Sequence, residues 1–160
     1  MIKEIDRSSI SECVIVIRKS FATVAKEFGF TQENAPRFTA FATTEERLEY
    51  QLYNEHRLMY AYFSDDEKII GYYSLLPDEK KCELNNLCVL PEHRHKGIGA
   101  ELLKDAFVRA EEKGCEIINI GIVEENTVLR KWYEDNGFIH TGVKKFDFFP
   151  FTCGYMTKQL

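Results

Sequence analysis

A short basic segment with two glycines, Arg-His-Lys-Gly-Ile-Gly-Ala at 94–100, gives the clearest chemical signal in this chain. Gly97 and Gly99 have no Cβ atoms, so the backbone can approach an anion closely. A helical pattern begins there, and the free N–H groups at a helix N-terminus attract phosphate. Arg94, His95 and Lys96 add positive charge. The segment therefore predicts a loop that holds a pyrophosphate, although a solvated basic loop has the same composition.

The flanking residues decide which type of phosphate loop this is. A strand-like run, 82–90, precedes the loop, and apolar residues at helical spacing follow it as far as Gly114, a typical helix stop. A dinucleotide-binding fingerprint requires a third glycine where Leu102 stands. A nucleoside triphosphate loop requires Gly-Lys-Ser or Gly-Lys-Thr, which is absent. What remains is Arg-x-x-Gly-x-Gly between a strand and a helix.

A second strand and helix carry another group of residues. The run 116–123 is rich in β-branched side chains, and Asn126 follows it at the start of a helical pattern. Tyr133 lies seven residues after Asn126, and the pattern closes with Gly137 and Phe138. Two spaced motifs in a fixed order are far more specific than either motif alone.

Both motifs resemble those of the GNAT superfamily of N-acetyltransferases, over residues 68–160; the first 67 residues agree only in general layout. The resemblance implies acetyl-coenzyme A as acyl donor and transfer of its acetyl group to an amine. No metal is expected, and direct transfer in a ternary complex is the preferred route. It implies that the strand backbone before the loop pairs with pantetheine and that one N–H there polarises the thioester carbonyl. The implied coenzyme-binding residues are Leu87, Cys88, Val89, Arg94, His95, Lys96, Gly97, Ile98, Gly99, Ala100 and Asn126.

Acetylation of an amine needs a base, because an alkylammonium with a pKa of about 10.4 is nearly all protonated at neutral pH. Glu83 is the candidate, because the histone-acetylating branch of the superfamily carries its glutamate base eleven residues before the loop arginine. A solvated carboxylate at the end of a strand is the alternative. The ribosomal-protein branch places a base five residues before the asparagine, where this chain has Gly121, so that route is closed.

The leaving thiolate needs a proton, and a phenol with a pKa near 10 is suited to supply it. Tyr133 holds the position that the resemblance assigns to this acid; simple packing of its ring is the alternative. Cys88 lies close to the expected acyl group, but no histidine is evidently paired with it, so direct transfer is preferred over an acyl-cysteine. Asn126 could cap its helix, contact the pantetheine arm, or do both.

The expected acceptor is the primary amine of a small molecule. A protein or peptide amine, and a non-catalytic acyl-coenzyme A sensor, are the alternatives. The presence of both Glu83 and Tyr133 favours catalysis over the sensor. The acceptor region is expected between the first two helices and the turn at 146–151, where many phenylalanines occur, although aromatic residues equally suit core packing.

Composition and charge limit the number of domains, the partners and the cellular location that we expect. With 160 residues, of which 44% are hydrophobic, the chain is long enough for one domain, 1–160, and short for two. A net charge of −5 argues against nucleic acid as partner. The amino terminus lacks a secretory pattern, no run is long enough to span a membrane, and five scattered cysteines fit reduced thiols, so a cytoplasmic protein is expected. A second copy of the chain, in a homodimer, is a candidate partner. A zinc site from Cys82, Cys88, His93 and His95 matches no familiar ligand spacing.

The periodicity along the chain predicts an α/β (α+β) fold with the element order β-α-α-β-β-β-α-β-α-β-β, as in the GNAT fold. The central sheet is expected to be mixed, of about seven strands, with helices on both faces. Ser9 with Glu12, and Thr43 with Glu46, predict capping boxes for the first two helices, and Gly29 is expected to end the first.

Overall fold

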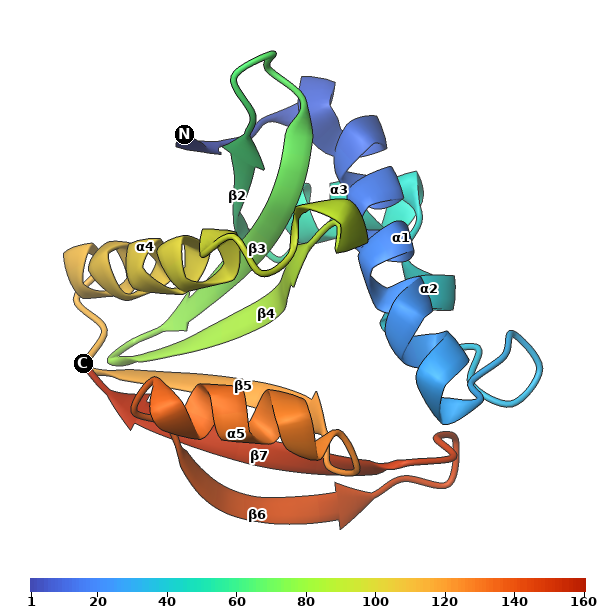
Figure 1. Ribbon diagram of the computed structural model, residues 1–160. Coiled ribbons are helices and arrows are strands. Elements are labelled where there is room, and N and C mark those ends of the chain that lie inside the picture. The colour runs from blue at the N-terminus through green and yellow to red at the C-terminus, as the bar shows by residue number, and fades with distance from the viewer.

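The computed structural model describes residues 1–160, and a mixed sheet of seven strands runs through its centre (Figure 1). The strand order is β1-β2-β3-β4-β5-β7-β6, and every neighbouring pair is antiparallel except β4 and β5. The predicted mixed seven-stranded sheet is therefore confirmed. The strands are β1 (Ile2–Glu4), β2 (Leu58–Phe63), β3 (Ile69–Asp78), β4 (Lys81–Val89), β5 (Ile117–Val123), β6 (Ile139–Lys145) and β7 (Thr152–Gln159).

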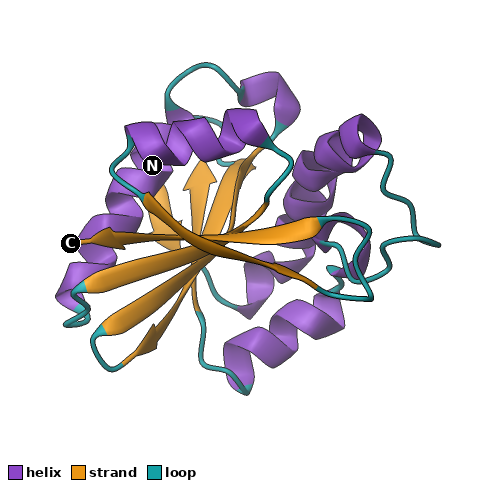
Figure 2. Cartoon of the chain, turned by 90° about the horizontal axis from the view of Figure 1, so that it is seen from below, coloured by secondary structure: helices purple, strands orange, loops and turns teal.

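Helices cover both faces of the sheet (Figure 2). On one face lie α1 (Ile10–Phe28) and α3 (Glu45–Tyr53), and on the other lie α4 (Ile98–Glu112) and α5 (Thr127–Asp135). The predicted order omits the single turn α2 (Thr39–Ala42) and the 3-10 turns η1 (Arg7–Ser9) and η2 (Pro91–His93), which are too short to give a periodic pattern.

The helix ends show which caps the sequence predicts correctly. Gly29 ends α1 in the left-handed conformation, at φ 73°, as expected. The Ser9–Glu12 capping box is wrong: Ser9 makes no side-chain cap, and the Glu12 carboxylate accepts from the backbone N–H of Ile69 instead, at 2.9 Å. The cap of α3 is Thr44, which accepts from the Arg47 N–H, and not Thr43.

Two apolar clusters hold the layers together. The larger one lies between the sheet and α4 with α5, and it joins residues from both sides of the β4–β5 junction, such as Leu84, Leu102, Ile120 and Tyr133. The second lies between the sheet and α1 with α3. Because the larger cluster is continuous across the junction, the two halves of the sheet share one core.

The junction of β4 and β5 opens into a gap. The two strands pair only at their beginnings, where Lys81, Cys82 and Glu83 lie beside residues 117–119. Beyond these pairs the strands diverge, as Figure 1 shows. A bulge in β4 adds one residue relative to β3, and Asn86, at φ 56°, lies at this irregularity. Beyond residue 83 of β4 and residue 119 of β5, the facing backbone edges of the two strands therefore have no strand partner.

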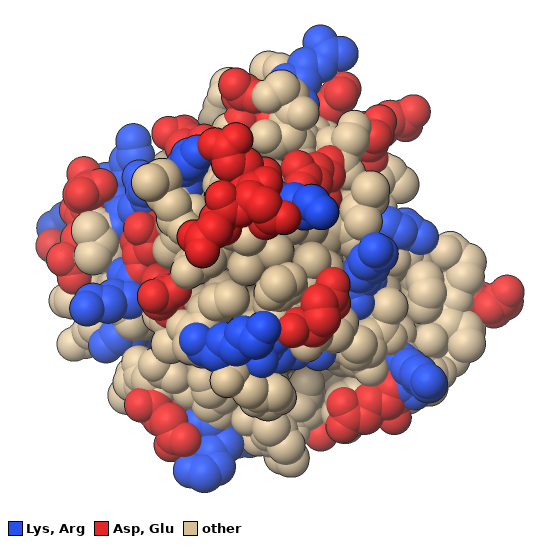
Figure 3. Space-filling view, turned by 45° about the horizontal axis from the view of Figure 1, so that its top comes forward, with Lys and Arg blue, Asp and Glu red and all other residues tan.

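Two further features of the molecule are the apolar character of its helices and the distribution of its surface charges. No helix combines the length and apolar character needed to cross a bilayer. On the face drawn in Figure 3, acidic and basic side chains are interspersed.

Candidate functional site

The loop at 95–100 presents a row of unbonded backbone amides. From His95 to Ala100, no main-chain N–H donates to a protein acceptor; the next amide, of Glu101, bonds the Gly97 carbonyl at 3.1 Å. His95 and Gly97 have positive φ angles of 62° and 83°, which turn the loop into the first turn of α4. Successive free amides at a helix N-terminus form an anion-binding concavity. The geometry thus suits the predicted pyrophosphate loop.

Arg94 differs from its expected role, because its guanidinium points into the protein. Its Nε donates to the Val89 carbonyl at 3.1 Å, and its two terminal nitrogens donate to Thr23 Oγ1 at 2.9 Å and to the Ser20 carbonyl at 2.8 Å. The expectation that Arg94 adds charge for a phosphate is therefore corrected: its side chain ties the loop to α1 and β4. The exposed side chains of His95 and Lys96 remain available to an anion.

The last residues of β4 border the gap. Leu87 and Val89 pack toward the α4 side, and Cys88 packs toward α1. The Val89 carbonyl already accepts from Arg94 Nε, which leaves it one lone pair for a further donor. Burial raises the pKa of the Cys88 thiol to about 12, which leaves it protonated at neutral pH. Cys82 and Cys88 lie in clusters on opposite faces of β4, so they do not converge on a metal.

Glu83 lies where the pairing of β4 with β5 ends. It is exposed, it pairs with Leu76 of β3 and Asn119 of β5, and its neighbours Cys82 and Leu84 are buried on the α4 face. Since side chains alternate along a strand, Glu83 points to the opposite face. It is thus placed at the closed end of the gap, with access to solvent.

Tyr133 lies on α5 against the larger core cluster, 6% exposed. Its ring contacts those of Trp132 and Phe138 edge-on, and its hydroxyl has no hydrogen bond within the protein. Burial raises the pKa of Tyr133, with a smaller contribution from Cys88, so the phenol stays protonated at neutral pH. Asn126 caps α5 as predicted by accepting from the Leu129 N–H at 3.2 Å.

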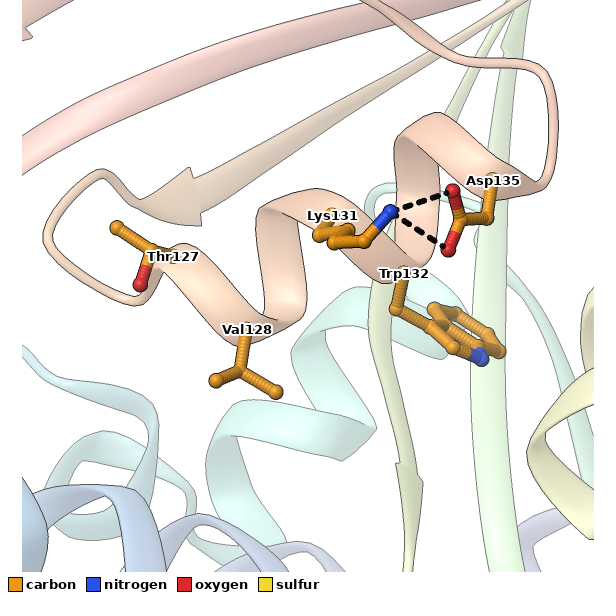
Figure 4. Close-up of a pocket in the computed structure, with 5 residues that line it drawn as sticks. All are labelled: Thr127, Val128, Lys131, Trp132 and Asp135. Carbon is orange, nitrogen blue, oxygen red and sulfur yellow. Dashed lines mark hydrogen bonds and ion pairs between the residues drawn. The ribbon is translucent and has the colours of Figure 1, made fainter.

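Trp132 is a residue of the site that the sequence reasoning missed. Its ring lies over Gly99, where a Cβ would meet Trp132 Cζ2 at 3.7 Å, so it links α5 to the first turn of α4. Trp132 also borders an open hollow on α5 together with Thr127, Val128, Lys131 and Asp135 (Figure 4). The one available signal was its position as the sole tryptophan, next to Tyr133.

The basic residues of α5 are engaged with carboxylates. Arg130 bonds Glu124 at 2.8 Å and Glu134 at 3.0 Å, and Lys131 bonds Asp135 at 3.1 Å, as Figure 4 shows for the latter. These ion pairs are typical of a solvated helix surface.

Aromatic side chains bridge the open end of the gap. Phe30 and Phe38, from the segment after α1, contact Phe151 of the β6–β7 connection, with ring centroids 4.8 and 5.8 Å apart. Phe149 stacks on Phe151 at 4.5 Å, and Val123 at the end of β5 belongs to the same cluster. The phenylalanines expected around the acceptor therefore pack mainly on one another.

Comparisons with known proteins agree on one family. The sequence profile of the Acetyltransferase (GNAT) family matches residues 27–138. The spermidine N(1)-acetyltransferase of Thermoplasma acidophilum is 34% identical over 73 residues, which are 46% of this chain and 45% of that protein. An uncharacterised N-acetyltransferase of Mycobacterium tuberculosis, Rv2669, is 28% identical over 82 residues, 51% of this chain and 53% of that one. This chain thus spans about half the length of the curated relatives that it matches.

Solved structures share the fold. The PaiA N-acetyltransferase of Thermoplasma acidophilum, crystallised with coenzyme A, superposes with a TM-score of 0.83 at 22% identity, over 100% of this chain and 98% of that chain. A GNAT family acetyltransferase of Elizabethkingia anophelis with bound acetyl-coenzyme A has a TM-score of 0.65 at 26% identity, over 73% of this chain and 84% of that chain.

Proposed function

This chain belongs to the GNAT acetyltransferase family, and on that premise we propose that it transfers an acetyl group from acetyl-coenzyme A to the primary amine of a small molecule. The observation that carries the proposal is the row of unbonded amides from His95 to Ala100 at the start of α4. Backbone donors at a helix N-terminus suit the pyrophosphate of the coenzyme. The Elizabethkingia relative, 26% identical, binds acetyl-coenzyme A, which supports the same ligand here.

The gap between β4 and β5 would hold the pantetheine arm of the coenzyme. Both strands present unpaired backbone edges there, and an extended ligand can pair with such an edge as an added strand. Leu87 and Cys88 line the β4 side, and Trp132 and Asn126 lie at the entrance from α5. A backbone N–H of β4 would polarise the thioester carbonyl.

Glu83 and Tyr133 would carry the proton transfers. Glu83 is solvent-accessible at the closed end of the gap, where it can take a proton from the incoming ammonium directly or through water. Tyr133 keeps its proton because burial raises its pKa, and its hydroxyl is free to donate to the leaving thiolate. Proton transfer by a positioned group contributes a factor of about 10²–10⁴ in rate.

Direct transfer in a ternary complex fits the state of Cys88. A nucleophilic cysteine must be a thiolate, and the Cys88 thiol is kept protonated by burial. An acyl-cysteine intermediate is therefore disfavoured.

A small-molecule acceptor is supported by the match to a spermidine acetyltransferase, which covers 46% of this chain. A peptide amine is the second candidate, because GNAT enzymes that act on ribosomal proteins share this fold. Gly121 stands where the resemblance would place the base of that branch, which favours the small molecule.

The test is a pair of glycine variants measured by calorimetric titration with acetyl-coenzyme A. Gly97→Val places a branched side chain beside the free amides, and we expect the affinity to fall about 10-fold or more, the loss of one hydrogen bond to a charged group. Gly114→Val is the matched control, because both glycines have φ near 82° and no atom within 4 Å of an added Cβ. Both variants carry the same backbone strain, so equal affinities in folded Gly97→Val and Gly114→Val would exclude the loop as the coenzyme site.

A further inference from the structure

The two faces of β5 differ in their access to solvent. Ile118, Ile120 and Ile122 are buried in the larger apolar cluster, against α4 and α5. Gly121 lies on the opposite face and is exposed. Helix α1 also lies on that opposite face, but it packs on β3 and β4. An acceptor can therefore reach the gap over β5 at Gly121, from the face on which Glu83 also lies.

One aromatic side chain leans over this exposed position. Tyr155 on β7 stands between two glycines, Gly121 of β5 and Gly142 of β6. A Cβ atom added to Gly121 would meet Tyr155 Cε1 at 3.9 Å, whereas a Cβ atom added to Gly142 would meet nothing within 4 Å. The ring is therefore directed over β5, the strand that borders the gap, rather than over β6. It is 38% exposed, so a ligand can touch it.

The position of Tyr155 along the gap is that of the expected acceptor. Gly121 is two residues beyond Asn119, which pairs with Glu83 in the last pair between β4 and β5. Because the two strands are parallel, Gly121 lies past Glu83 in the direction of Leu87, which lines the proposed pantetheine site. The Tyr155 ring therefore borders the space between the candidate base and the acyl group.

A ring over a glycine limits the width of a site. Gly121 has no side chain of its own, so the Tyr155 ring is the side chain that covers this part of β5. An aromatic ring is rigid, because only two torsion angles move it. Rigid apolar walls discriminate by size, and one methylene group that fits poorly changes kcat/KM by about 10-fold to 200-fold. Such a wall favours a narrow carbon chain beside the reacting nitrogen.

We infer that Tyr155 is a specificity-determining residue, which selects a primary amine on an unbranched carbon chain over one with a branch or a ring beside the nitrogen. This inference rests on the proposed acetyltransferase function and names the acceptor class for that site. An aromatic ring that only packs over a glycine would contribute to stability without affecting the choice of amine.

The test compares two acceptors with equal numbers of non-hydrogen atoms, hexylamine and cyclohexylamine, and measures kcat/KM by coenzyme A release. Wild type should prefer hexylamine about 10-fold or more. Tyr155→Ala removes the wall and should bring the two values close together. Gly121→Ala adds a methyl group at an ordinary contact distance from the ring, so it should fold and strengthen the preference. Tyr155→Phe keeps the ring and should keep the wild-type preference.

Ile139→Ala is the matched control, because Ile139 is exposed on the same face of the sheet but lies on the edge strand β6. It should keep the wild-type preference. The Tm of each variant separates packing from selection: a Tyr155→Ala protein with lowered Tm and an unchanged preference would overturn the inference. Loss of the preference in Tyr155→Phe would also overturn it, because the hydroxyl and not the ring would then select.

The proposed function and this inference fail in different ways. If wild type acetylates amines but Tyr155→Ala and Gly121→Ala both keep its preference, only the inference falls. If no amine in a broad panel releases coenzyme A from wild type, the proposed function falls, and the inference falls with it.

Discussion

Arg94 offers the sharpest test of the site. Its side chain forms hydrogen bonds within the protein, whereas the motif suggests that it binds a ligand. Its guanidinium donates to the Val89 carbonyl, to Thr23 Oγ1 and to the Ser20 carbonyl, at 2.8–3.1 Å. A lysine keeps the charge but cannot reproduce this planar fork of donors. Arg94→Lys should therefore damage stability while preserving the charge of the loop.

The size of the effect follows from the three bonds. Hydrogen bonds to charged groups contribute about 1.5–3 kcal/mol each. Arg94 is only half-buried, so water replaces part of the loss, and we expect a destabilisation of about 2–4 kcal/mol. For a chain of this size, 1 kcal/mol shifts Tm by about 2–4 °C. The predicted fall in Tm is therefore roughly 4–16 °C.

The assay pairs Arg94→Lys with Lys96→Met and measures both Tm and affinity for coenzyme A. Lys96 is exposed and has no hydrogen bond or ion pair within the protein. Its loss should leave Tm within about 2 °C, as is usual for surface substitutions, while weakening coenzyme binding. An Arg94→Lys protein with wild-type Tm and an affinity loss equal to that of Lys96→Met would refute the reasoning and make Arg94 a phosphate ligand.

Two further predictions concern the chemistry at the gap. Tyr133→Phe keeps the packing ring, so turnover should fall about 10²–10⁴-fold while the affinity for the coenzyme stays nearly constant. A thioester with a more acidic leaving thiol should partly restore the turnover of this variant. Wild-type turnover in Tyr133→Phe would make Tyr133 a packing residue. Cys88→Ala should keep most of the turnover, because the pKa of the thiol is raised to about 12 and the thiolate is scarce up to pH 9. Mass spectrometry should accordingly show that iodoacetamide leaves Cys88 unmodified between pH 7 and 9. An acetylated Cys88 that forms and decays at the catalytic rate would contradict direct transfer.

The elements of this protein follow from local signals. Periodicity predicts the strands and the long helices, and the left-handed glycines at 29 and 114 lie at the ends of α1 and α4 as expected. Asn126 caps α5 because the capping bond depends on residues within one turn. The row of free amides at 95–100 was also predictable, because its glycines and its amides lie within one short segment of sequence.

The details that sequence alone could not give depend on distant partners. Arg94 turns inward because α1 offers acceptors more than 70 residues away in sequence. Glu12 leaves its expected capping box for the amide of Ile69, 57 residues away. The bulge at Asn86 depends likewise on the pairing of β4 with β3, which no pattern within β4 announces.

The apolar cluster that continues beneath the β4–β5 gap has a kinetic consequence. Because Leu102, Ile120 and Tyr133 belong to one core on both sides of the divergence, packing holds the strands apart before any ligand arrives. Binding free energy is then not spent on separating them, which is the advantage of preorganisation. Coenzyme association should accordingly proceed as a single encounter step, without a slow opening phase.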